Sequence, residues 1–358
     1  MNPFPSNPVE VFTYDEVGNR VDSNQNGLST FNAANQLEED AEFTYSYDAN
    51  GNQIRKTNKM TGLLTHFEYD AENRLIQLIR EDGRIMRYRY DGLGRRLEKD
   101  VAGVVTRYIY DNEDILLELD GSDNILARYT HGPGIDEPLI MERDLDLSST
   151  FEVNETFFYH ADGLGSVSEL TNIAGTAVET YAYDSFGQIS QQIGTLGNPF
   201  TYTAREFDSD SSLYFYRARY YDSNTGRFIT KDPRLIDSQL NLYPYVRNNP
   251  VRFTDPSGEV SPATVPCAII SGVAAAATVA NMADLAIDLN KLEDEKNRLI
   301  DCAKMILDDP AGNLGELERI TRRLKDIEIE AVRKARDKAI SEFGASVASL
   351  VFAFCFAL

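Results

Sequence analysis

Hydrophobic and polar residues alternate in short runs along the first two thirds of the chain, and most of these runs end in an aromatic residue. In residues 85–90 (IMRYRY), Met86, Tyr88 and Tyr90 alternate with an isoleucine and two arginines. A period of two places successive side chains on opposite faces of a β-strand, with one face buried and the other in water. The pattern therefore predicts short antiparallel strands joined by turns.

The runs belong to an internal repeat with spacings of 16 to 22 residues. Each unit reads aromatic, Asp or Asn, two variable residues, then Gly, Asn or Glu, and soon afterwards an apolar residue. The Asp side chain can accept a hydrogen bond from the backbone two residues on and begin a turn, and Gly or Asn tolerates the positive φ that follows. Repeated strands of this length indicate an extended, spiralling antiparallel sheet in which each unit packs on its neighbours. The aromatic residues that mark the units are Tyr14, Phe31, Tyr47, Tyr69, Tyr90 and Tyr110.

The tyrosines of this repeat are predicted to be structural. A catalytic pair is needed once, whereas the Tyr-Asp pair recurs along the chain. A tyrosine also suits such a sheet, because its ring packs on one face while its hydroxyl reaches water or backbone. We therefore expect Tyr90, Tyr110 and their equivalents to be largely buried.

The densest aromatic stretch is residues 213–233 (LYFYRARYYDSNTGRFITKDP), which also alternates. Its turn is expected at DSNTGRF with Gly226 as the positive-φ residue, and the Asp-Pro pair is expected to end the strand. The alternation predicts one face formed by Tyr214, Tyr216 and Tyr220 and the other formed by Phe215 and Tyr221.

The sequence changes character after residue 258, where Ala, Leu, Ile, Glu and Lys replace the tyrosines and the period becomes 3.6. Two amphipathic stripes, 285–306 and 317–331, predict an antiparallel helical hairpin interrupted by DDPAGNLG. The uncharged segments 265–283 and 344–358 lie at either end of this hairpin. They fit buried helices, a membrane-active hairpin or a degraded or truncated effector, and a membrane span needs about 20 predominantly apolar residues.

The composition argues against several classes of function. A net charge of -22 argues against a nucleic-acid partner, because a polyanion would be repelled. The three cysteines have no zinc-site spacing and the three histidines are scattered, so no metal site and no cofactor is expected. The first twenty residues have neither the basic region nor the apolar core of a signal peptide.

The order of the motifs resembles a known family. The Tyr-Asp repeats, the segment 157–189, the aromatic stretch 213–233 and NLYPYVRNNPVRFTDPSG at 241–258 resemble bacterial Rhs/YD-repeat proteins with a C-terminal Rhs repeat-associated core. These proteins include polymorphic toxins and the C subunits of toxin complexes. The resemblance covers residues 10–258 and implies YD repeats at 1–156, a core at 157–258 and a variable helical C-terminal domain at 259–358.

In that family the repeats form a β-shell around a C-terminal toxin, and the core acts as an intramolecular aspartyl protease. The resemblance implies that Asp232 and Asp255 are the catalytic pair and that the cut falls between Glu259 and Val260, with Lys231 as an auxiliary residue. Two carboxylates that share a proton can activate water and protonate the leaving amine. In the alternative interpretation, the two aspartates merely begin Asp-Pro turns.

This sequence departs from the family pattern at three places. Glu259 stands where the family has Leu, at the expected cut itself. Ser238 and Gln239 replace the usual Gly-Gly, and Lys231 replaces an Arg that relatives often have.

The size of the sheet gives a further expectation. About 240 strand residues cover roughly 3,800 Å², whereas enclosing a 100-residue domain needs roughly 6,000–8,000 Å². The sheet is therefore expected to stay open, either as part of a longer shell or as a half-cup.

Two classes of function follow. The first is the C-terminal part of a secreted or cell-surface toxin-delivery protein, whose partners are its own C-terminal domain, an immunity protein and the secretion machinery. The second is a structural or surface interaction protein with an open sheet and a helical tail that contacts a membrane, without catalysis. Carbohydrate binding by exposed tyrosines is a third class for which the sequence names no site.

Overall fold

The computed structural model describes residues 9–148, 151–234 and 241–259, which all fall in one compact unit, Met1–Val265. These residues form three antiparallel sheets and three short 3₁₀ turns, so the predicted antiparallel β class is confirmed. The predicted helical hairpin, the two uncharged segments and Val260 lie outside the described residues. No helix in the described part has the length and hydrophobicity needed to cross a membrane.

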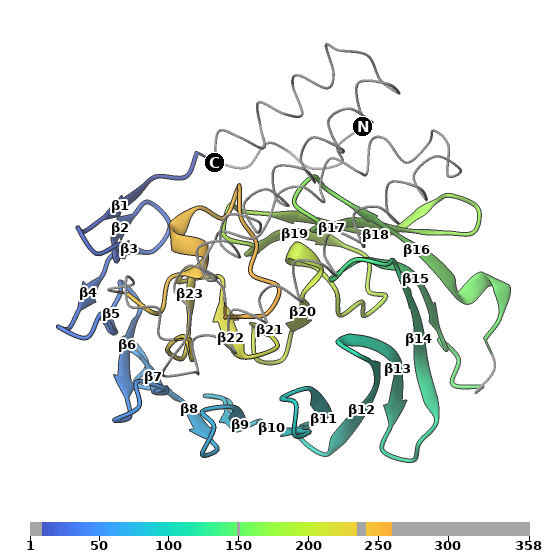
Figure 1. Cartoon of the computed structure of the whole chain (residues 1–358), viewed down its shortest axis with the longest axis horizontal. Coiled ribbons are helices and arrows are strands. Elements are labelled where there is room, and N and C mark those ends of the chain that lie inside the picture. The colour runs from blue at the N-terminus through green and yellow to red at the C-terminus, as the bar shows by residue number, and fades with distance from the viewer. Residues whose placement is uncertain (1–8, 149–150, 235–240, 260–358) are drawn as a thin grey trace, which may run out of the picture. The chain divides into compact units, whose positions relative to one another are not determined.

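The largest sheet has 16 strands, β4 to β19, and every strand pairs with its neighbours along the chain. Both end strands, β4 and β19, have a partner on one side only, so this sheet is open, as expected. It continues without a break from the repeats into the following segment, because β15 and β16 pair directly. Figure 1 shows these strands running in order around the inner strands β20 to β23. The strands are β4 (Thr30–Phe31), β5 (Leu37–Glu39), β6 (Phe43–Tyr47), β7 (Gln53–Asn58), β8 (Leu64–Tyr69), β9 (Leu75–Ile79), β10 (Ile85–Tyr90), β11 (Arg96–Val101), β12 (Val104–Asp111), β13 (Asp114–Asp120), β14 (Ile125–His131), β15 (Pro138–Arg143), β16 (Thr156–Ala161), β17 (Val167–Asn172), β18 (Ala177–Tyr183) and β19 (Ile189–Ile193).

The Asp of each repeat builds the turn between two strands. The Asp91 carboxylate accepts hydrogen bonds from the backbone N–H groups of Leu93 and Arg95, at 2.8 and 3.0 Å. Gly94 has a φ of 84° and donates its N–H to the Asp91 carbonyl. Asn73 takes the same position in the preceding repeat with a φ of 62°. The turn chemistry predicted from the motif is therefore present.

The tyrosines of several repeats link their unit to the preceding one. The hydroxyl of Tyr90 donates to the carbonyl of Leu75 at 2.6 Å, and that of Tyr110 donates to the carbonyl of Arg96 at 2.9 Å. Tyr69 and Tyr183 make equivalent bonds, and His131 stands in the same position against Ile115.

These tyrosines are partly exposed at one end but pack against the buried clusters, which agrees with the structural role predicted for them. The fully buried inner positions lie two residues earlier on the same face, because the tyrosine itself stands at the strand end, where the turn begins. The buried residues two positions before the motif are Tyr45, Phe67, Tyr88, Tyr108, Tyr129, Phe157 and Tyr181.

A small sheet and the chain around it fill the concave face of the large sheet, and we call residues 198–234 and 241–259 the inner group. Its residues Leu213, Phe215, Tyr220 and Ile229 share a buried cluster with residues of β8 to β10. Phe200 packs against residues of β12 to β18. The elements of the inner group are η2 (Tyr202–Ala204), β20 (Glu206–Asp208), β21 (Leu213–Tyr216), β22 (Arg219–Asp222), β23 (Arg227–Phe228) and η3 (Tyr245–Asn248).

The remaining elements precede the strands of the large sheet in the sequence or lie between two of them. They are β1 (Phe12–Tyr14), β2 (Arg20–Ser23), β3 (Gly27–Leu28) and the turn η1 (Val153–Glu155). The Arg20 guanidinium lies 4.3 Å from the Phe12 ring centroid and 3.9 Å from that of Phe186, which connects the small N-terminal sheet to the turn after β18.

The hairpin β21–β22 corrects one prediction. Tyr214 pairs with Tyr221 and Phe215 pairs with Tyr220, so Tyr221 shares a face with Tyr214 and Tyr220 shares the other with Phe215. The sequence alternation had assigned them the other way round, as if the strand were continuous. The chain instead reverses at Arg217, which has a φ of 53°, and the turn resets the alternation. Gly226 has the predicted positive φ.

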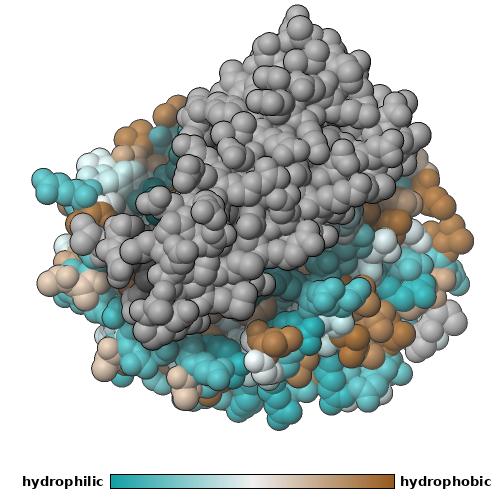
Figure 2. Space-filling view, viewed as in Figure 1, coloured by the Kyte–Doolittle hydropathy of each residue, from teal (hydrophilic) through white to brown (hydrophobic). Residues whose placement is uncertain are grey.

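The surface of the described residues is mixed rather than uniformly apolar. Figure 2 shows mainly hydrophilic residues along the lower edge of the view, with separate hydrophobic groups among them. Some outward residues are strongly exposed, such as Leu93 and Val104, at 82% and 73%.

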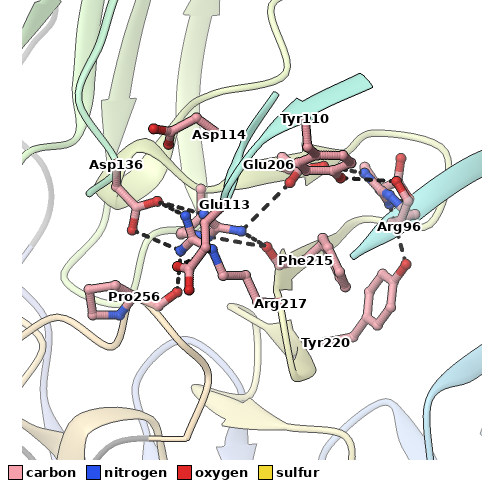
Figure 3. A network of polar contacts seen from close by, with 12 residues as sticks. Arg96, Tyr110, Glu113, Asp114, Asp136, Glu206, Phe215, Arg217, Tyr220 and Pro256 are labelled. Carbon is pink, nitrogen blue, oxygen red and sulfur yellow. Dashed lines mark hydrogen bonds and ion pairs between the residues drawn. The ribbon is translucent and has the colours of Figure 1, made fainter. Parts of the chain in front are cut away.

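Arg96 joins the large sheet to the inner group through a fully buried ion pair network (Figure 3). Its guanidinium contacts Glu206 at 2.7 Å and Asp208 at 2.9 Å, and Lys99 contacts Asp208 as well. Burying three charges is costly unless they are paired, and removal of the central cation leaves Asp208 with Lys99 and Glu206 with Arg205 as their only ionic contacts among the described residues.

We expect Arg96→Met to lower the free energy of unfolding by about 3–5 kcal/mol, the range for a buried ion pair that loses one partner. Chemical denaturation followed by circular dichroism measures the change. Arg107→Met is the matched control, because Arg107 pairs with Glu98 and Asp123 at a more exposed position. Equal midpoints for the two variants would contradict the proposed contribution of the buried network.

Candidate functional site

Asp232 and Asp255 both lie in the inner group and are almost completely buried, with exposed fractions of 5% and 1%. Each also begins a turn. Asp232 Oδ1 accepts the N–H of Arg234 at 2.9 Å, and Asp255 Oδ1 accepts the N–H of Glu259 at 3.1 Å. The turn role expected in the alternative interpretation is therefore present, but it uses only one oxygen of each carboxylate.

The second oxygen of each aspartate contacts the same nitrogen of Arg219. Arg219 Nη2 lies 3.1 Å from Asp232 Oδ2 and 3.4 Å from Asp255 Oδ2. Asp232 and Asp255 thus contact the same guanidinium.

Arg219 is held from several sides. Its Nη1 donates to the carbonyl of Leu242 at 3.0 Å, its Nε donates to the carbonyl of Gly258, and its guanidinium lies 3.5 Å from the centroid of the Phe228 ring. Burial lowers the pKa of Arg219 below its usual value, although Asp232 and Asp255 act in the opposite direction. A buried cation facing two carboxylates is stable only with such a complete set of partners.

Sequence reasoning did not select Arg219. The cation chosen from the family pattern was Lys231, whose Cε and Nζ lie next to Gly51 in the turn between β6 and β7. A signal was nevertheless present, because Arg219 is a charged residue inside an otherwise aromatic run. Such a residue in a buried strand needs a carboxylate partner.

The expected cut lies directly beside this cluster. The N–H of Glu259 binds Asp255, and the Glu259 carboxylate pairs with Arg234 at 2.9 Å on the partly exposed side. Val260, Ser238 and Gln239 lie outside the described residues, so the structure places only the N-terminal side of the expected cut.

Gly258 makes the closest approach of this segment to the rest of the inner group. Its φ is 70°, and a Cβ at this position would lie 2.1 Å from the carbonyl oxygen of Tyr216. Glycine is therefore required here both by backbone conformation and by space.

One group of acidic residues has a spacing that could hold a cation. The carboxylates of Asp144, Asp146 and Glu155 bring ligand oxygens within 4.8 Å of one another. Both oxygens of Glu155 already accept backbone N–H groups, from Leu145 and Glu152. These hydrogen bonds account for the arrangement of Glu155 without a metal ion.

We expect Gly258→Ala to release residues 255–259 from the inner group, since the added methyl group would collide with the Tyr216 carbonyl and the left-handed backbone costs about 1–2 kcal/mol. Limited proteolysis should then cut near residue 258 much faster than in the parent. Gly94→Ala is the control, because Gly94 also has a positive φ but a Cβ there would meet no atom within 4 Å. Equal proteolysis of the two variants would show that the close approach is unimportant.

Comparisons with known proteins agree with this architecture. A family model described as Teneurin YD-shell matches residues 5–251. The tRNA nuclease WapA of Bacillus subtilis (strain 168) is 32% identical over 278 residues, covering 70% of this chain and 11% of that protein. Toxin protein Tse5 of Pseudomonas aeruginosa is 27% identical, covering 69% of this chain and 21% of that protein.

One more relative and one solved structure are also similar to this chain. Toxin subunit YenC2 of Yersinia entomophaga is 39% identical over 116 residues, covering 32% of this chain and 10% of that subunit. The solved structure of the Photorhabdus luminescens Tc holotoxin pore is similar with a TM-score of 0.46 and 18% identity, covering 72% of this chain and 17% of that chain. The chain thus spans between 10% and 21% of the length of the three curated relatives. Because the family model matches most of the chain, the protein belongs to the YD-shell family, within the Rhs/YD-repeat proteins to which its repeats were assigned.

Proposed function

We propose that this chain is the C-terminal part of an Rhs-type toxin-delivery protein that cuts itself between Glu259 and Val260. Asp232 and Asp255 are the catalytic pair, and the released C-terminal segment is the effector. The observation that carries the proposal is the meeting of both buried carboxylates on Arg219, with the Glu259 N–H bonded to one of them.

The chemistry follows that of other carboxylate pairs. One aspartate takes a proton from a water molecule, which attacks the carbonyl carbon of Glu259. The other aspartate, which enters the reaction protonated, gives that proton to the nitrogen of Val260 as the peptide bond breaks. The products are a carboxyl group at Glu259 and a new N-terminus, and the pair again holds one proton.

The wider role rests on the relatives and is part of the same proposal. Tse5 and YenC2 carry the words toxin protein and toxin subunit in their names. By analogy, residues 1–156 are shell repeats, 157–258 are the core and 259–358 are the effector. The partners are then the chain's own C-terminal domain, an immunity protein and a secretion apparatus, and the protein acts outside the producing cell or at its surface.

One observation favours a purely structural alternative. Asp232 and Asp255 each use one oxygen to begin a turn and the other to pair with Arg219. Such a network can serve only to hold residues 241–259 in the inner group, as in a surface interaction protein without catalysis.

Intact mass after expression distinguishes the two functions. Self-cleavage predicts two fragments, whereas the alternative predicts one chain of 40.2 kDa. Asp232→Asn and Asp255→Asn should each abolish cutting, because Asn keeps the shape but cannot take or give the proton. Asp120→Asn is the control, since Asp120 is a partly exposed turn residue whose carboxylate also accepts backbone N–H groups.

The variant Glu259→Leu tests the departure from the family pattern. We expect it to cut faster, because it removes a carboxylate next to the catalytic pair. If the parent and Glu259→Leu both remain intact while circular dichroism shows a folded sheet, the protease function is wrong.

A further inference from the structure

Three consecutive residues of the β21–β22 turn bind three consecutive carbonyl groups of the segment that leads to the proposed cut. Arg217 Nη1 donates to the carbonyl of Pro256, and the Ala218 N–H donates to that of Ser257. Arg219 Nε donates to the carbonyl of Gly258. The contacts advance by one residue on each side, so the segment 256–258 is held in a single register.

The turn that makes these contacts is itself fixed to the large sheet. Figure 3 shows Arg217 directed toward Asp136, Glu113 and the Pro256 carbonyl. Arg217 Nη2 lies 2.9 Å from Asp136 Oδ1, and its Nε lies 3.2 Å from Glu113 Oε2. Arg205 binds the same Asp136 carboxylate at 2.6 Å. Asp136 belongs to the turn between β14 and β15, and Glu113 to the turn between β12 and β13, so two turns of the sheet anchor Arg217.

We propose that residues 217–219 form a register clamp, which decides which peptide bond faces Asp232 and Asp255. The proposal rests on the proposed self-cleavage and adds the residues that select the bond. Residues 217–219 are positioning residues, because they bind the backbone of the segment to be cut.

The spacing of residues along the backbone explains why a clamp is needed. Successive Cα atoms are about 3.8 Å apart, so a slip of one residue would bring a different carbonyl to the carboxylates. Backbone carbonyls are chemically alike. A site that binds only carbonyls therefore cannot distinguish one register from the next unless one residue of the segment fixes it. Gly258 is that residue, because any larger residue collides with the Tyr216 carbonyl.

Arg219 contacts both the held segment and the proposed catalytic pair. The same guanidinium binds the Gly258 carbonyl and both aspartates. The carbonyl of the next residue, Glu259, is the one attacked in the proposed reaction. The clamp therefore places the end of the held segment one residue before the bond to be cut.

The first test measures where and how fast the chain is cut. Arg217→Met removes the charged contacts to Pro256, Asp136 and Glu113 but keeps most of the side-chain length, and Arg107→Met is the matched control. We expect Arg217→Met to cut about tenfold more slowly, the effect of losing one charge-assisted hydrogen bond, and to give fragments that begin at more than one residue. Mass spectrometry of the C-terminal fragment gives both readouts. A single cut at the parent bond and the parent rate would overturn the clamp.

The second test does not require cleavage. In the Asp232→Asn background, which is expected to stay uncut, hydrogen exchange reports how firmly residues 257–259 are held. Adding Arg217→Met or Arg219→Lys should raise exchange of these amides by about tenfold. Unchanged exchange in both variants would overturn the clamp.

The two proposals fail in different ways. A parent chain that stays intact contradicts self-cleavage, whatever the exchange experiment shows. A parent chain that is cut, with arginine variants that are cut at the same bond and rate, contradicts the clamp and leaves the self-cleavage in place. Rescue of the cut position by Arg217→Lys, which restores a cation, would support the clamp over a general loss of folding.

Discussion

Buried arginines that are paired across the boundary between the large sheet and the inner group hold this structure in one arrangement. A guanidinium is costly to bury without polar or charged partners, so a paired arginine favours the arrangement in which its partners meet it. Arg96 lies in the large sheet and has its partners in β20, whereas Arg205 lies in the inner group and pairs with Asp136 in the turn between β14 and β15. Arginines of the large sheet thus pair with the inner group, and arginines of the inner group pair with the large sheet. These ion pairs fix the position of the inner group on the sheet, which apolar contacts alone would define only loosely. The aromatic clusters supply most of the buried area, but ring packing alone tolerates small shifts that ion pairs do not.

Arg219 extends the same principle inside the inner group itself. Its partners come from three stretches of the chain, at Asp232, Leu242 and Asp255 to Gly258. A site of this kind cannot form until the hairpin β21–β22 and these three stretches of the inner group are all in place. The candidate chemistry is therefore coupled to completion of the fold, which suits a reaction that a chain performs once on itself.

The sheet was predictable from the sequence because its determinants are local. Alternation, the Asp turn and the positive-φ glycine each act within a few residues, and the repeat multiplies the signal. The faces predicted for Tyr220 and Tyr221 were wrong, because a turn of two residues interrupts the alternation before them. Asp232 and Asp255 came from the family resemblance, and Arg219 was missed because its partners are brought together only by long-range folding.

The tyrosine hydroxyls that donate hydrogen bonds to the preceding repeat make the stability of the fold depend on pH in the alkaline range. They serve as donors only while protonated, and burial raises the pKa of Tyr90, Tyr110 and Tyr183 well above the ordinary value of 10.0. The unfolded chain would lose these protons near pH 10, so the stability they contribute is complete below that pH and declines above it. Because the chain contains 19 tyrosines and no tryptophan, the same rings also give its intrinsic ultraviolet signal. A titration with base would thus follow the loss of the inter-repeat bonds through the chromophore that makes them.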